Sequence, residues 1–187
     1  MTGGRRKKSQ TSQRCAVSAE SGSAPLILSC PVTGTPSKQV HTLTIRSLIR
    51  RLPLGMPKTQ YYFCEAAGCD VVYFPLNKRA PVFHRGDLIV RVGGKETAEP
   101  IPICYCFGFT RKGILKEIAE TGDSTVADRI STEVKKGNCA CEVKNPSGKC
   151  CLGNVAREVK AAYEQIKESG LDLSDSLGRS RNNHHEY

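Results

Sequence analysis

Eight of the ten cysteines in this 187-residue chain lie in close pairs. Thiolates spaced in this way are the ligands that zinc and iron–sulfur clusters take. An even number of cysteines also permits a secreted disulfide scaffold, but no apolar run of signal-peptide length follows the basic amino terminus. We therefore expect a reduced, cytoplasmic, metal-binding protein. The pairs are Cys64 with Cys69, Cys104 with Cys106, Cys139 with Cys141, and Cys150 with Cys151.

The pair at Cys64 and Cys69 flanks a short turn between two β-rich runs. A turn of this kind places two thiolates on one side, as a tetrahedral zinc ion requires. Cys30, which precedes another turn, can supply a third ligand, whereas no fourth ligand is evident from the sequence. The alternative is that these cysteines are small buried hydrophobic side chains.

The remaining pairs predict a second centre in the later half of the chain. Its ligands are Cys104 and Cys106, one thiol of the Cys139 pair, and one of the Cys150 pair. Cys-x-Cys followed by a helix, with the last pair ahead of another helix, places these thiolates at two helix N-termini. Backbone N–H groups and the helix dipole stabilise negative charge there, which suits the four thiolates of an iron–sulfur cluster. The alternative is a structural zinc ion held by four cysteines.

These thiols need a scaffold, and the hydrophobic pattern predicts an α+β fold. β-branched and aromatic residues predict a hairpin over Tyr61–Phe74 and a strand over Leu88–Val92. Apolar residues at helical spacing predict four helices, the last of which begins at Cys151 or Asn154. These helices cover residues 42–52, 110–121, 124–136 and 151–169.

The predicted strands give way to helices near residue 100, which divides the chain into two small modules. We expect a β-rich zinc-binding module over residues 25–100 and a helical module over residues 101–170. Residues 1–24 and 171–187 have the polar composition of disordered tails. Each module is small enough that bound metal is expected to contribute to its stability.

Charge and composition exclude several classes of function. The net charge is +10, and residues 1–60 hold ten Lys and Arg residues against one acid, Glu20. No aromatic side chains interleave these charges to stack on bases, so nucleic acid is not the expected partner. No segment approaches the length of about 20 apolar residues that spans a membrane. Phosphate-binding loops, dinucleotide fingerprints and nucleophile elbows are missing, so we do not expect a classical enzyme.

Three stretches together resemble a known family: YYFCEAAGCDVVYF, CYCFGFT and GNCACEVKNPSGKCCLGN. They are similar to the amino-terminal domain of CopZ-type copper chaperones, and the last helical part resembles the bacterioferritin-associated ferredoxin-like [2Fe–2S] domain. The resemblance runs from about Cys30 to Tyr163. It implies one zinc ion in the β-rich part and one [2Fe–2S] cluster in the helical part. The implied cluster ligands are Cys104, Cys106, Cys141 and Cys151, which leaves Cys139 and Cys150 as spare thiols.

The sequence departs from the family pattern at two points. Some relatives carry Cys-Pro-x-Cys where this chain has a neutral threonine, Thr33, so the zinc shell must be completed by another group. The candidates are Cys15, Asp70, His41 or water. Full-length chaperones also continue into a copper domain with a Met-x-Cys-x-x-Cys loop, and this sequence contains no such motif.

The resemblance and the thiol pattern together predict a single-electron carrier in copper handling. We expect it to take electrons from a donor protein and to reduce Cu(II) to Cu(I) for a copper-carrying partner. The rival hypotheses are a structural protein with two zinc sites, a basic zinc protein that binds nucleic acid, and a thiol enzyme that uses Cys150. The last requires a reactive thiol of low pKa, and no base adjoins Cys150 in the sequence.

Overall fold

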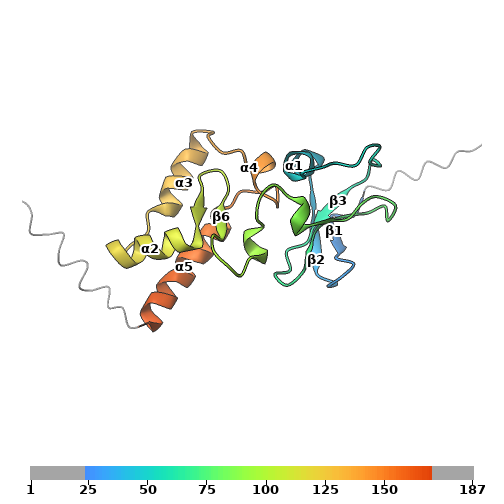
Figure 1. The fold of residues 1–187 in the computed structure, drawn as a ribbon. Coiled ribbons are helices and arrows are strands. Elements are labelled where there is room, and N and C mark those ends of the chain that lie inside the picture. Colours follow the sequence, from blue (N-terminus) through green and yellow to red (C-terminus); the bar gives the residue numbers. More distant parts are fainter. Residues whose placement is uncertain (1–23, 170–187) are drawn as a thin grey trace, which may run out of the picture.

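The computed structural model describes residues 24–169 of the chain. Within this range strands come first and most of the helices follow, which is the expected α+β arrangement. Figure 1 shows the sheet with helix α1 at one end of the molecule and helices α2, α3 and α5 at the other. The two tails predicted to be disordered lie, except for Ala24, outside the described residues.

The first part of the structure is a five-stranded antiparallel sheet in which neighbours in sequence are neighbours in space. The predicted hairpin is confirmed, with Tyr62 paired to Phe74 across its two strands. Aromatic and β-branched residues favour this pleated, half-buried setting. The five strands are β1 (Ile27–Ser29), β2 (Pro36–Val40), β3 (Tyr61–Phe63), β4 (Val71–Pro75) and β5 (Phe83–His84).

The two faces of this sheet carry different residues because successive side chains of a strand point to opposite sides. Tyr61 and Tyr73 pack on one face with Ile45 of helix α1 (Thr42–Leu48). Tyr62 and Phe74 pack on the other face beside three cysteines. Their rings stack with centroids 5.7 Å apart. The sheet therefore separates a core of aliphatic and aromatic side chains from a core that contains the three cysteines.

The prediction made from the sequence is wrong for the segment that follows the sheet. The predicted strand over Leu88–Val92 makes only one isolated bridge, between Leu88 and Ile49. That bridge also shortens the predicted first helix, since Ile49 is already extended with φ −81° and ψ 127°. The chain then forms two 3-10 turns around this segment, η1 (Arg85–Asp87) and η2 (Gly93–Lys95).

The second part of the structure consists of a short hairpin and three helices around one core, together with a fourth, short helix. The hairpin, which the sequence did not predict, joins β6 (Pro102–Cys104) to β7 (Phe109–Thr110). Three predicted helices are confirmed within two residues at each end, and the four-residue α4 is new. The helices are α2 (Arg111–Thr121), α3 (Val126–Lys135), α4 (Cys141–Lys144) and α5 (Leu152–Glu168).

Local sequence explains where helix α2 begins and ends. The Thr110 hydroxyl accepts a hydrogen bond from the N–H group of Gly113 (3.2 Å), which caps α2. Gly122 ends the same helix in the left-handed conformation, with φ 77°.

Helix α5 buries Val155 and Ile166 against α2 and α3. Helix α4 packs instead against α1, so it lies where the two parts meet.

Candidate metal centres

Three cysteines that are distant in sequence meet on the second face of the sheet. The Sγ atoms of Cys30, Cys64 and Cys69 all lie within 4.8 Å of one another, and each residue is at most 3% exposed. The Cys30 and Cys69 sulfurs are 3.9 Å apart. A tetrahedral zinc ion with bonds of about 2.3 Å separates its sulfur ligands by about 3.8 Å. Three thiols at this spacing can therefore bind one metal ion.

Strand ends and two tight turns position these thiols. Cys64 follows β3, and its N–H group donates to the carbonyl of Val72 on β4 (3.0 Å). Cys69 precedes β4, and its N–H group closes the turn by donating to Ala66 (3.2 Å). Cys30 follows β1 at the start of a turn that Gly34 completes with φ 71°. The sheet register therefore brings both turns to the same end.

Burial and hydrogen bonds shift the pKa values of the Cys30 and Cys64 thiols. Burial raises the pKa of the Cys30 thiol, but the Thr33 hydroxyl and the backbone N–H groups of Thr33 and Val32 outweigh it and lower the pKa to about 7. Burial raises the pKa of Cys64, against the smaller effects of the Ala66 N–H group and the Lys95 charge. Cys30 therefore loses its proton more easily than Cys64, which favours metal binding because the thiolate is the ligand.

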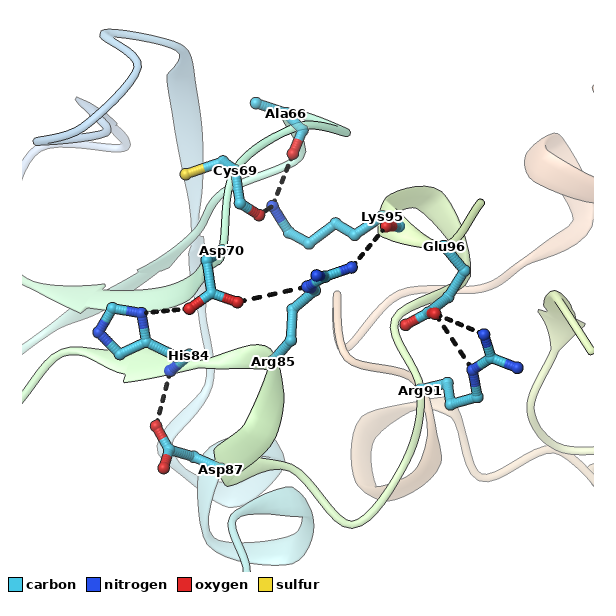
Figure 2. Close-up of polar contacts among 9 residues, drawn as sticks. All are labelled: Ala66, Cys69, Asp70, His84, Arg85, Asp87, Arg91, Lys95 and Glu96. Carbon is cyan, nitrogen blue, oxygen red and sulfur yellow. Dashed lines mark hydrogen bonds and ion pairs between the residues drawn. The ribbon is translucent and has the colours of Figure 1, made fainter. Parts of the chain in front are cut away.

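The described residues place no fourth ligand with these three thiols. The only group of three or more metal-ligating side chains found among residues 24–169 is this trio. Thr33 Oγ1 lies 4.0 Å from Cys64 Sγ, so the threonine that replaces a cysteine of the family pattern lies next to this thiol. The Asp70 carboxylate is engaged by His84 Nδ1 (2.9 Å) and by Arg85 Nε (3.3 Å), as Figure 2 shows. His41 does not join the trio, and Cys15 lies outside the described residues.

The thiols of the second part form two pairs. Cys106 and Cys141 have their sulfurs 3.7 Å apart, and the Ala140 N–H group donates to Cys106 Sγ (3.3 Å). Cys104 and Cys151 form the second pair, in which each thiol shifts the pKa of the other. The charges of Cys104 and Cys141 both raise the pKa of Cys151, so the two pairs are close enough to interact. Among the described residues, however, no three of these four sulfurs lie within 4.8 Å of one another as those of Cys30, Cys64 and Cys69 do.

In at least one of these pairs the two thiols differ in acidity. The interaction with the Cys151 thiol and the N–H groups of Phe107 and Cys106 lower the pKa of Cys104 to about 6, against the effect of burial. The interaction with Cys104, together with burial, raises the pKa of Cys151. Burial and the contact with Cys106 raise the pKa of Cys141 to about 12. A metal that binds here must therefore displace protons from Cys141 and Cys151.

The elements that carry these thiols differ in part from the prediction. Cys141 begins α4 and Cys151 caps α5, so both lie at helix starts. Cys104 and Cys106 do not lie at the start of α2, because the β6–β7 hairpin intervenes and Gly108 turns the chain there with φ 73°. Of the adjacent cysteines, Cys151 is buried whereas Cys150 is exposed.

The turn before Cys150 is built around a buried asparagine. Asn145 Oδ1 accepts hydrogen bonds from the N–H and hydroxyl groups of Ser147 (3.1 Å each), and its Nδ2 donates to the Lys149 carbonyl (2.7 Å). Tyr73 of the sheet donates its hydroxyl proton to the Pro146 carbonyl (2.8 Å). The turn is therefore fixed both internally and from the sheet, which holds Cys151 in place.

Sequence reasoning missed the buried Lys95 beside these centres, and the structure also gives the Tyr105 hydroxyl a hydrogen-bond partner. Lys95 is 2% exposed, and its Nζ donates to the carbonyls of Ala66 (2.7 Å) and Cys69 (3.1 Å) in the turn that carries two thiols. Tyr105, between two cysteines of the second group, donates to the Arg91 carbonyl (3.1 Å). A lysine after two glycines looks like a surface residue, so no signal in the sequence reveals its burial.

Comparisons with known proteins place these centres in a family context. A family model for the CopZ type, described as a zinc binding domain, matches residues 27–89. The chain is 35% identical over 153 residues to the copper chaperone CopZ of Archaeoglobus fulgidus, with 78% of this chain and 72% of that protein covered. The X-ray structure of the N-terminal domain of that CopZ matches with a TM-score of 0.58 and 33% identity, over 70% of this chain and 96% of that one. In the described part of the chain, no helix has both the length and the apolar character that a membrane span needs.

Proposed function

The chain belongs to the family of CopZ-type copper chaperones and contains their N-terminal domain, and from this we propose that it is an electron carrier with two metal centres. One centre holds zinc and the other a [2Fe–2S] cluster. The observation that carries the proposal is the different grouping of the two sets of thiols, one as a compact trio and the other as two pairs.

We assign zinc to Cys30, Cys64 and Cys69. The donor set fits, because all three are buried thiols at the spacing that one tetrahedral ion requires. The match of the zinc binding domain model to residues 27–89 covers all three positions. The fourth position is filled by a group that Thr33 does not supply, since a neutral hydroxyl is a poor zinc ligand. Zinc then stabilises the β-rich part, whose strands are short.

We assign the [2Fe–2S] cluster to Cys104, Cys106, Cys141 and Cys151. A single zinc ion would need all four sulfurs around one point, whereas a cluster of two irons takes two thiolates on each iron. Two separate thiol pairs fit the second arrangement. The exposed Cys150 and the half-buried Cys139 remain free. We also propose that the helical part is of the bacterioferritin-associated ferredoxin-like type.

Two features of the surrounding structure suit this site to electron transfer. The Ala140 N–H group points at the Cys106 sulfur, which stabilises negative charge there. Phe107 and Phe109 pack half-buried against the helical core and limit the access of water. Both features tune the reduction potential of a bound centre. A [2Fe–2S] cluster held in this way supplies reversible one-electron transfer.

We propose copper handling as the process that this electron serves, because the similar protein from A. fulgidus is a copper chaperone. The chain accepts an electron from a donor protein and passes it to Cu(II), which becomes Cu(I) on a copper-carrying partner. We propose the cytoplasm as its location, since none of the nine cysteines of the described residues forms a disulfide.

A copper reduction assay tests this proposal. The protein is reduced anaerobically with dithionite, freed of reductant and mixed with Cu(II) in the presence of a Cu(I) chelator. We expect about one Cu(I) per bound cluster. The control is the Cys139→Ser/Cys150→Ser double variant, which removes the spare thiols as an electron source. If that variant keeps its visible absorbance but yields no Cu(I), the free thiols reduce copper and the proposal is wrong.

A further inference from the structure

A buried lysine touches the zinc turn from a distant part of the chain. Lys95 is 2% exposed, and its ammonium group donates to two carbonyls of the turn between Cys64 and Cys69, as Figure 2 shows. Burying a charge is costly unless it is paired or hydrogen-bonded. Three thiolates and one divalent ion leave a net charge of −1, which a nearby ammonium group balances. Two hydrogen bonds and the charge balance of the bound ion therefore both favour a lysine ammonium group beside this site.

The 3-10 turn η2, which carries Lys95, also contacts the loop that holds Cys104 and Cys106. The Gly93 N–H group donates to the Tyr105 hydroxyl (2.8 Å), and that hydroxyl donates to the Arg91 carbonyl (3.1 Å). A Cβ atom at Gly93 would lie 1.9 Å from the Pro102 carbonyl oxygen, so the backbones are in close contact. Tyr105 itself lies between Cys104 and Cys106.

Further bonds hold this segment rigidly between the two ends. Arg91 pairs with Glu96 through Nε (3.1 Å) and Nη2 (2.6 Å). Arg85 Nη1 donates to the Lys95 carbonyl (2.9 Å), and its Nε contacts Asp70 (3.3 Å), the residue after Cys69. The segment from Arg91 to Glu96 is therefore tied to the zinc turn by both a side chain and its backbone.

We propose that the Arg91–Glu96 segment couples the two centres, with Lys95 as the positioning residue for the zinc turn and Tyr105 as the positioning residue for the Cys104–Cys106 loop. When zinc binds, it restrains the turn that Lys95 contacts. This restraint reaches the Tyr105 hydroxyl through the hydrogen bond from the Gly93 N–H group. The proposal rests on the assignment of zinc to Cys30, Cys64 and Cys69 above. It does not require that iron be bound.

Zinc affinity tests the first half of the proposal. Competition with a chelator is measured on the full chain, on Lys95→Met and on Lys38→Met, which removes an exposed lysine of β2. Loss of a charged hydrogen-bond donor predicts a 10- to 100-fold weaker zinc affinity for Lys95→Met. Lys38→Met should bind zinc as the unchanged chain does, and Lys95→Arg should recover part of the loss. Equal affinity of Lys95→Met and Lys38→Met overturns the role of Lys95.

Hydrogen exchange tests the coupling itself. Backbone exchange over residues 91–107 is followed by mass spectrometry with zinc and after its removal, in the unchanged chain, Lys95→Met and Tyr105→Phe. We expect zinc to slow this exchange about tenfold in the unchanged chain. Tyr105→Phe should still bind zinc but lose this slowing, which keeps the test decisive even where Lys95→Met does not fold.

Two results overturn the coupling, and they are distinguishable. If zinc binds and protects the Cys64–Cys69 turn but leaves residues 91–107 unchanged, the coupling is wrong and the zinc assignment stands. If the unchanged chain binds no zinc, the zinc assignment fails and the coupling fails with it. Because exchange is read without reference to iron, a failure of the cluster assignment leaves this test intact.

Discussion

At the scale of single residues, the adjacent Cys150 and Cys151 have different surroundings although they are chemically identical. Cys151 is 2% exposed and its pKa is raised by the interaction with Cys104, whereas Cys150 is exposed. We predict that Cys151→Ser loses most of the visible absorbance of the anaerobically purified protein, because oxygen is a harder ligand than sulfur. Cys150→Ser, the matched control, should keep it. The opposite pattern in the spectra would assign the ligand to Cys150.

Thr33 offers a second test at this scale. Its hydroxyl lies 4.0 Å from Cys64 Sγ, so a thiol in its place can reach the metal that Cys64 binds. Thr33→Cys should tighten zinc about tenfold or more, as a soft fourth ligand completes the shell. Val32→Cys, which adds a thiol at a residue that is 68% exposed, is the control. No gain in a competition titration of Thr33→Cys would mean that another group already fills that position.

Residue types and spacing predicted which cysteines could bind metal, but they could not predict their grouping. The thiols of Cys64 and Cys69 were expected together because a short turn joins them. The pairing of Cys106 with Cys141, rather than with Cys104, depends on the β6–β7 hairpin and on α4. Lys95 was missed because its burial depends on contacts with residues about 30 positions earlier in the chain.

At the scale of elements, the Gly93–Gly94 pair at the start of η2 allows a matched comparison. A Cβ atom at Gly93 would lie 1.9 Å from a backbone oxygen of β6, whereas one at Gly94 meets nothing within 4 Å. We predict that Gly93→Ala lowers the free energy of unfolding by about 1–3 kcal/mol, as overpacking does. Gly94→Ala should change it by less than about 0.5 kcal/mol. Denaturant unfolding that shows equal effects would contradict the close contact.

Elements with strong periodicity were predicted well, and elements defined by long-range contacts were not. Helices α2, α3 and α5 have apolar stripes, and α2 also has a capping threonine, whereas the β3–β4 hairpin has aromatic strands around a short turn. The predicted strand over Leu88–Val92 fails because its only partner is Ile49 at the end of α1. Strands β1 and β2 lack the aromatic residues that identify β3 and β4.

At the scale of the whole molecule, one buried hydroxyl joins the sheet to the loop before the last cysteines. Tyr73 donates to the Pro146 carbonyl across the boundary of the two parts. Tyr73→Phe leaves that carbonyl unpaired, which we expect to cost about 1–3 kcal/mol of stability and to speed the loss of iron to a chelator. Tyr61→Phe, which breaks a bond to Pro81 within the first part, should leave the rate of iron loss unchanged. Equal rates for both variants would mean that the boundary contact does not support the second centre.

The arrangement of the two parts could not be predicted from the sequence. Hydrophobic periodicity shows which face of an element is buried, but not which other element covers it. The contact of α4 with α1, and of Tyr73 with Pro146, joins residues about 70 to 100 positions apart. The coupling proposed through Lys95 and Tyr105 likewise depends on contacts between residues that are distant in sequence.

The most direct test of the whole account is a count of iron, acid-labile sulfide and zinc in the anaerobically purified protein. Two pairs of thiols and one trio predict about two irons, two sulfides and one zinc per chain, with absorbance in the visible range. Loss of Cys64 should remove zinc, and loss of Cys141 should remove iron and sulfide together. A colourless protein with zinc in both centres and no sulfide would contradict the account and support a structural role for both sites.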